Sequence, residues 1–263
     1  MNNLKYAIKN ISINFKNARE LKSSFIISII GMCINNISFV ILWFYFGKSV
    51  GVINGWNPYD IFFMYSLTTG SYGLVHMFFY GINKIPTYIT TGNFDKFLST
   101  PKGILTKVAT SDISTSAIGD FIFGIICFIC YCIFEQFTWF KLLLFIIFLL
   151  TASIITFAFE LICKSISFYL MDGENVSNGL YGTFLSVTTY HGGAITGILK
   201  YIFIFIIPSF VIGAFPVEVM KNFSFINFFE ILILTFIWFY ISIKFFYKST
   251  KKYESNNFFG FGG

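Results

Sequence analysis

The stretch LLLFIIFLLTASIITFAFELIC, from Leu142 to Cys163, decides the fold class of this 263-residue chain. Uninterrupted apolar runs of about 20 residues match the thickness of the hydrocarbon core of a lipid bilayer. Because lipid offers no hydrogen bonds to peptide groups, such a run has to form a helix. The stretch contains a single charged residue, Glu160. It therefore predicts a transmembrane helix.

Further stretches of this kind occur along the whole chain, and the segments between them are short. The predicted spans are Phe25–Phe46, Ile61–Tyr80, Ile113–Phe134, Leu142–Cys163, Gly192–Ala214 and Phe223–Ile243. The composition agrees, since 56% of the residues are hydrophobic and 11% are charged, whereas a soluble chain carries about a quarter charged residues. We expect an all-α, polytopic integral membrane protein with six transmembrane helices and no separate soluble domain.

Three regions follow from these spans: an N-terminal segment (1–24), a transmembrane domain (25–246) and a C-terminal tail (247–263). Apolar residues in the first region recur at helical spacing, with lysines on the other faces; they are Leu4, Ile8, Ile11, Phe15 and Ala18. This spacing favours a short amphipathic helix in the plane of the cytoplasmic headgroups. The alternative is a disordered basic tail.

The distribution of basic residues predicts the orientation of the chain. With the N-terminus in the cytoplasm, all but three of the 18 lysines and arginines fall in cytoplasmic segments, and the exceptions are Lys48, Lys141 and Lys221. This asymmetry follows the positive-inside rule. We expect both termini to be cytoplasmic and the protein to reside in the cell membrane.

The formal net charge of +6 does not indicate nucleic-acid binding. The basic residues flank apolar spans instead of forming one solvated face, so they are expected to touch anionic lipid headgroups. All five cysteines lie inside predicted spans with no histidine beside them, and no metal site is predicted from them: Cys33, Cys127, Cys130, Cys132 and Cys163.

The segment between the second and third spans carries the most specific pattern, YITTGNFDKFLSTP from Tyr88 to Pro101. Gly92 permits a positive φ or a close approach by another chain. Asp95 can cap a short helix or accept a hydrogen bond from an arginine. Pro101 stops that helix from running into the third span. The segment is predicted to form a short, rigid helix across the cytoplasmic mouth; the alternative is a plain connector.

The same segment resembles the I-x-x-G-x-[LF]-D-x-x-L-x-x-P signature of a group of ABC-2 type transporter permeases. The matching residues are Ile89, Gly92, Phe94, Asp95, Leu98 and Pro101. Gly55-Trp56-Asn57 before the second span, and Ile207-Pro208 and Phe215-Pro216 around the fifth, are similar to further elements of that group.

The resemblance implies the permease subunit of an ATP-driven exporter that works by alternating access. Its partners would be a separate ABC ATPase subunit, which binds ATP and Mg, and a second permease, either identical or related. The 88–101 segment would contact the ATPase, with Phe94 and Leu98 as anchors because they are four residues apart on one helix face, and Asp95 as the oriented charge.

The chain itself is predicted to be neither an enzyme nor a cofactor-binding protein. A G-x-x-x-x-G-K-[ST] phosphate-binding pattern does not occur in the sequence, so ATP hydrolysis is expected on the partner. His76 and His191 are the available histidine bases, and neither lies in a recognisable catalytic pattern.

Three acids fall within predicted spans, where an ionised carboxylate is costly: Asp120, Glu160 and Glu230. Glu160 is expected to pair with Lys164 at the cytoplasmic interface. Asp120 is expected near the inner headgroups, and Glu230 near the end of the last span, against a partner helix. An ion-coupled secondary transporter that uses Asp120 or Glu160 is the alternative function.

Small residues gather on one face of the second predicted span: Ser66, Thr69, Gly70 and Gly73. Such a face lets another helix approach closely, and helix packing is favoured over a substrate path. Nothing in the sequence identifies the substrate.

Overall fold

The computed structural model describes residues 3–20, 22–99 and 103–254, and over these ranges the chain is helical without a β-strand. The long helices are α1 (Asn3–Glu20), α2 (Lys22–Val50), α3 (Asp60–Phe79), α7 (Ser116–Phe134), α8 (Trp139–Ser165), α9 (Gly173–Thr188) and α12 (Phe225–Thr250). The expected all-α class is confirmed.

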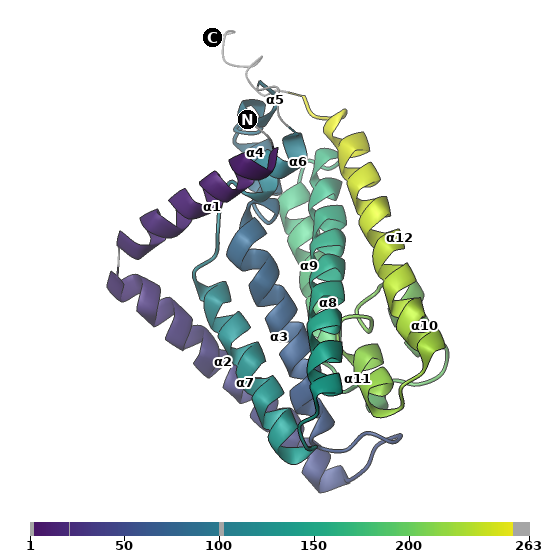
Figure 1. Cartoon of the computed structure of the whole chain (residues 1–263). Helices are drawn as coiled ribbons and strands as arrows, with labels where there is room; N and C mark the ends of the chain where they lie inside the picture. Colours follow the sequence, from purple (N-terminus) through teal and green to yellow (C-terminus); the bar gives the residue numbers. More distant parts are fainter. Residues whose placement is uncertain (1–2, 21, 100–102, 255–263) are drawn as a thin grey trace.

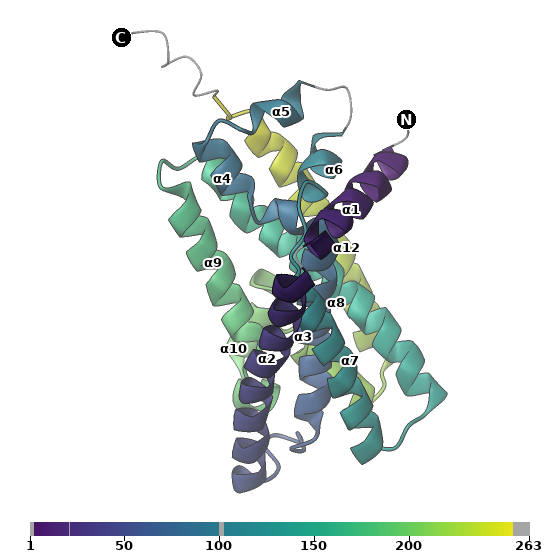
Figure 2. The same ribbon diagram turned by 90° about the vertical axis from the view of Figure 1, so that its left-hand side faces the viewer.

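Short helices connect the long ones at both ends of the bundle (Figures 1 and 2). At one end lie η1 (Tyr80–Ile82), α4 (Ile85–Thr90), α5 (Asp95–Leu98), α6 (Ile104–Ala109) and η2 (Ile166–Phe168). At the other lie η3 (Gly192–Ala194), α10 (Ile198–Tyr201), the π-helical turn η4 (Ile202–Ile206) and α11 (Ala214–Lys221). We call these the α4–α6 end and the α10–α11 end.

Among the described residues, four helical segments are long and apolar enough to cross a membrane: α2, α7, α8 continued by η2, and α12. They correspond to the first, third, fourth and sixth predicted spans. The second predicted span forms α3, which is 20 residues long but less apolar. It lies inside the bundle, where serine, threonine and histidine side chains on it are buried.

The fifth predicted span, Gly192–Ala214, is wrong as a continuous helix. The segment contains η3, α10 and η4 in sequence, and Gly197 has a φ of +66°. Pro208 lacks the N–H that a helix interior needs. The preceding segment, predicted to be a cytoplasmic connection, is instead the 16-residue helix α9. Glycines and polar residues kept the hydropathy of α9 too low for it to be recognised as a helix that crosses the bundle.

The α10–α11 end is closely packed around two glycines. A Cβ at Gly192 would lie 2.3 Å from the indole of Trp56, and one at Gly193 would lie 2.4 Å from the carbonyl oxygen of Ile53. Asn54 donates to the Gly193 carbonyl at 2.7 Å. Trp56 is therefore buried against protein, whereas Trp139 is 78% exposed.

The small-residue face of α3 packs against α7, as expected. A Cβ at Gly73 would lie 2.4 Å from the backbone nitrogen of Phe121, and one at Gly124 would lie 2.7 Å from the Cα of Gly70. These distances leave no room for a methyl group, because the atoms met are backbone atoms. Glycine is thus required at the point where the two helices cross.

The N-terminal segment forms α1, which contains no fully buried residue. Leu4 and Ile8 are exposed, while Phe15 packs against Phe78 with ring centroids 6.2 Å apart. Asn14 donates to the carbonyl of Thr110 near α6 at 3.2 Å. The helix therefore lies against the α4–α6 end, and its position in the headgroup plane remains a prediction.

Substituting Gly73 by alanine tests the α3–α7 contact. We expect Gly73→Ala to destabilise the protein by about 1–3 kcal/mol, the usual cost of overpacking. Gly182→Ala in α9 is the matched control, because a Cβ there meets nothing within 4 Å; it should be neutral or gain about 0.5–1 kcal/mol from reduced backbone entropy. Thermal unfolding in one detergent measures both. Equal melting temperatures for Gly73→Ala and the wild type would contradict the close contact.

Candidate functional site

The predicted cytoplasmic segment forms a helical hairpin, α4 followed by α5, instead of one helix across 88–101. Gly92 lies between the two helices with a φ of +71°, the left-handed conformation that glycine adopts without strain. The amide of Phe94 donates back to the carbonyl of Tyr88 at 2.9 Å and closes the turn. Of the signature residues, Pro101 lies outside the described residues.

Phe94 is not available as an exposed anchor. Its side chain is 0% exposed, whereas Leu98 is 43% exposed. The expected shared face required one continuous helix, but α5 begins only at Asp95. The ring of Phe94 instead packs against Phe168 and Tyr253, each at a centroid distance of 5.0 Å.

A small hydrophobic cluster thus forms beneath the α4–α5 hairpin, and we call it the hairpin cluster. Its buried members are Ile82, Ile85, Phe94, Phe97, Val108, Ala109, Leu161, Phe168 and Phe246, with Tyr88, Ile89 and Tyr253 packed against them. It joins the hairpin to the ends of α8 and α12. The Lys107 ammonium also donates to the carbonyl of Phe97, which ties α6 to α5.

Tyr253, just beyond α12, fastens the hairpin from the other side. Its hydroxyl donates to the carbonyl of Gly92 at 3.4 Å. Burial, together with a hydrogen bond to Asp95, raises the pKa of Tyr253 to about 12. The partner of Asp95 is therefore a tyrosine of the same chain, where an arginine had been one expectation. The contact of Tyr253 with the hairpin was not predicted from the sequence, because Tyr253 lies in a polar segment without a motif.

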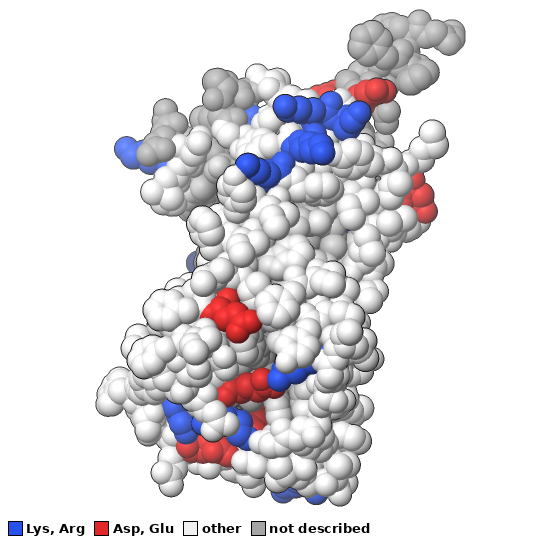
Figure 3. All heavy atoms as spheres, turned by 90° about the vertical axis from the view of Figure 1, so that its right-hand side faces the viewer, with Lys and Arg blue, Asp and Glu red and all other residues white. Residues whose placement is uncertain are grey.

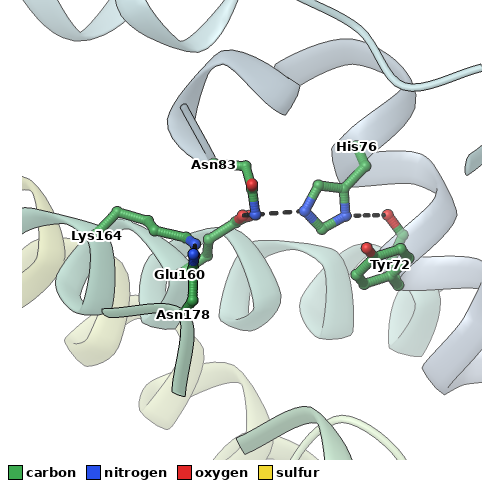
Figure 4. A network of polar contacts seen from close by, with 6 residues as sticks. All are labelled: Tyr72, His76, Asn83, Glu160, Lys164 and Asn178. Atoms are coloured by element: carbon green, nitrogen blue, oxygen red, sulfur yellow. Dashed lines mark hydrogen bonds and ion pairs between the residues drawn. The ribbon is translucent and has the colours of Figure 1, made fainter. Parts of the chain in front are cut away.

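A second group of polar side chains is buried between α3, α8 and α9 (Figure 4). Glu160 is 0% exposed, and its Oε1 lies 3.0 Å from His76 Nε2 and accepts from Asn83 Nδ2 at 2.9 Å. The other ring nitrogen of His76 lies 3.1 Å from the carbonyl of Tyr72. Sequence reasoning missed this network because His76 and Asn83 are 84 and 77 residues away from Glu160.

The expected ion pair between Glu160 and Lys164 is not among the ion pairs of the described residues. Lys164 donates to Asn178 of α9 instead, and its ammonium lies 5.7 Å from the centroid of the Tyr181 ring. Glu160 points toward α3, where His76 and Asn83 contact its Oε1, while its Oε2 is buried without a hydrogen-bond partner.

The contacts of His76 determine how many protons the network holds. A carbonyl oxygen can only accept, so Nδ1 carries a hydrogen toward Tyr72. The contact between Nε2 and Glu160 is then a hydrogen bond in two cases: His76 is an imidazolium, or Glu160 is protonated and donates to a neutral ring. In both cases one proton lies between Nε2 and Oε1, inside the bundle, and the His76–Glu160 pair has no net charge.

Asp120 lies deeper than expected. Its Oδ1 accepts from Asn36 at 2.6 Å, and Asn36 is near the middle of α2, not near its first turn. Asp120 is 2% exposed and lines a cavity bounded by α2, α3, α7 and α9. Glu230 is half-buried in the second turn of α12, toward the α10–α11 end. Within the described residues, no group of His, Cys, Asp and Glu forms a candidate metal site.

Most of the chain matches a known protein family. Residues 34–257 match the ABC-2 family transporter protein family. The chain belongs to this family. The match covers the hairpin, the buried network and all three intramembrane acids, and it agrees with the resemblance noted in the 88–101 segment. Searches of the curated proteins and of the solved structures found no match.

Membership identifies the chain as the membrane component of an ABC-2 transporter. The hairpin then occupies a position outside the apolar spans where a second subunit can reach it. The buried network and the Asp120 cavity lie within the bundle, beyond the reach of such a subunit. The ABC-2 protein therefore contains two distinct candidate regions, one at the α4–α6 end and one between the helices.

Removing the Glu160 carboxylate tests the buried network. Glu160→Ala leaves the donors of His76 and Asn83 without a partner, and each such group costs about 1–3 kcal/mol. We expect a lower melting temperature in detergent. Glu174→Ala is the control, because Glu174 accepts only at an exposed position, from Thr87, and should change stability by less than about 0.5 kcal/mol. The network assignment fails if the two variants melt together.

Proposed function

We propose that this chain is the permease subunit of an ABC-2 type exporter, in which a separate ABC ATPase binds the α4–α6 end and drives alternating access. The complete transporter would contain a second permease, identical or related, with ATP and Mg on the ATPase subunits. The observation that carries the proposal is the α4–α5 hairpin, which is exposed on its outer side and attached to α8 and α12 on its inner side.

The charge distribution supports a cytoplasmic α4–α6 end. Lysines gather there, and Figure 3 shows a band with few charged atoms below them, followed by acidic and basic groups mixed toward the other end. If α3 and α9 cross the membrane with the four apolar helices, the chain makes six crossings and both termini are cytoplasmic. Lys200 then moves to the outer side, where it pairs with Glu218 at 2.7 Å. The positive-inside asymmetry is retained.

The outer surface of the hairpin offers a contact area for the ATPase. Thr91, Asn93, Lys96 and Leu98 are exposed there. Leu98 contributes the apolar contact, because interface energy concentrates in a few well-packed side chains. Directly beneath them, Phe94 and Phe97 are buried in the hairpin cluster. A subunit that displaces the hairpin would therefore displace the ends of α8 and α12 as well.

Leu98 is the residue with which to test ATPase association. With the ATPase subunit co-expressed, Leu98→Ala should weaken co-purification by about 1–2 kcal/mol, or roughly 5–30-fold. Ile198→Ala is the matched control, since Ile198 is 77% exposed but lies at the α10–α11 end. Equal loss in the two variants would contradict docking at the hairpin.

Tyr253 tests transmission separately from association. Tyr253→Ala removes the ring that fastens the hairpin to α12, so we expect normal ATPase co-purification but reduced stimulation of ATP hydrolysis by substrate. Tyr253→Phe keeps the ring and should retain most of the stimulation. If Tyr253→Ala and Tyr253→Phe stimulate hydrolysis equally, the attachment does not transmit movement.

Cysteine labelling tests the orientation. In intact cells, an impermeant thiol reagent should modify a cysteine introduced at Ile198 and leave one at Asn93 unmodified, with labelling of both after permeabilisation. The chain without an introduced cysteine corrects for the five native thiols. Modification at Asn93 from outside would reverse the proposed orientation.

The His76–Glu160 pair favours one second candidate, an ion-coupled secondary transporter, because it holds a proton within the bundle. The two functions differ in their energy source. Transport that stops with a hydrolysis-deficient ATPase partner and persists with a protonophore supports the exporter. The reverse pattern supports the ion-coupled alternative.

A further inference from the structure

A cavity of about 350 Å³ lies between α2, α3, α7 and α9. Its size falls in the range of pockets that hold small organic ligands, about 300–1,000 Å³. Its lining combines polar residues, among them Asn35, Thr68, Thr69 and Ser186, with apolar ones, among them Met32, Phe39 and Leu185. The cavity is therefore suited to an amphipathic molecule with one polar group and one apolar part.

Asp120 is the acidic residue of the lining. No lysine or arginine lines the cavity, and no described residue forms an ion pair with Asp120. The amide of Asn36 satisfies Oδ1, but Oδ2 is buried without a hydrogen-bond partner. Buried carboxylates without a cation or a full set of donors are costly. The cavity thus contains an acid whose second oxygen lacks the partner that its burial calls for.

A cationic group with N–H donors is the ligand that fits this acid. A primary ammonium would donate to Oδ2 in a charge-assisted hydrogen bond, and its other hydrogens could reach the threonine hydroxyls of α3. Anions and neutral lipids lack such a donor and charge. The apolar lining residues would contact the hydrocarbon part, whose burial contributes about 0.8 kcal/mol for each methylene group.

We propose that this cavity binds an amphipathic primary amine, with Asp120 as the counter-ion, and that it is the substrate site of the transporter. The substrate role rests on the proposed permease function, whereas binding by the chain alone does not. The cavity contains residues from α3, the helix that continues through η1 into the α4–α5 hairpin. Movement of the hairpin would therefore reach the cavity along one continuous part of the chain.

The experiment measures binding to the purified permease without an ATPase. Octylamine is titrated calorimetrically into the chain in nanodiscs of uncharged lipid, and empty nanodiscs provide the partition background. Neutral N-octylacetamide, titrated in the same way, is the probe control. We expect saturable binding of octylamine to the wild type at near-neutral pH, and at least tenfold weaker binding of the acetamide.

Two variants locate the site. Asp120→Asn, which keeps the shape of the side chain, should weaken octylamine at least tenfold and leave the acetamide unchanged. Glu230→Gln is the matched control, because Glu230 is an acid in an apolar helix that does not line the cavity, and it should bind octylamine like the wild type. Ser186→Trp fills the cavity from an exposed position and should weaken both probes; it also keeps the test valid if Asp120→Asn does not fold.

The proposal is overturned if octylamine and N-octylacetamide bind the wild type equally. It is also overturned if Asp120→Asn or Ser186→Trp binds octylamine like the wild type, or if Glu230→Gln loses as much affinity as Asp120→Asn. These outcomes are independent of the hairpin experiments. Binding that follows this pattern while Leu98→Ala has no effect on ATPase association would support the site and contradict docking of the ATPase at the hairpin.

Discussion

Lipid provides no hydrogen bonds, and α3 carries more polar side chains than any bilayer-facing helix could expose without cost. Ser66, Thr68, Thr69, Ser71 and His76 are all buried on this helix. The more apolar helices α2, α7 and α8 pack around it and provide the hydrocarbon-facing surface. Close approach to α7 at Gly73 and Gly124 makes this enclosure possible, because no Cβ separates the two backbones there.

Enclosing α3 also connects the candidate regions. Thr68 and Thr69 line the cavity that contains Asp120, and His76, two turns further along, binds Glu160 of α8. The helix then continues through η1 into the hairpin at the α4–α6 end. One polar helix thus contributes residues to the proposed ligand cavity and to the His76–Glu160 pair, and it continues into the proposed contact with the ATPase. A movement of the hairpin could therefore be transmitted to both buried sites through α3.

The hairpin shows how much of a sequence motif can be interpreted without the tertiary structure. Gly92 was expected to permit either a positive φ or a close approach by another chain, and it has a positive φ. Phe94 was assigned to a partner subunit because it matches the family signature, yet the structure buries it against Phe168 and Tyr253. A signature position records that a residue is required; whether it is required for packing inside the chain or for docking outside it depends on residues far away in the sequence.

The sequence by itself determined the all-helical membrane class, four of the spans and the family, because these follow from the length and hydropathy of local runs and from one contiguous motif. It could not reveal α9, whose glycines and polar side chains make it resemble a loop, or the partner of Glu160, for which Lys164 was the nearest candidate. Tertiary structure decided both. Helix α9 packs one face against α8, and the partners His76 and Asn83 reach Glu160 only when α3 and α8 lie side by side. Hydrogen bonding within a membrane depends on which helices are neighbours, and sequence order does not specify neighbours.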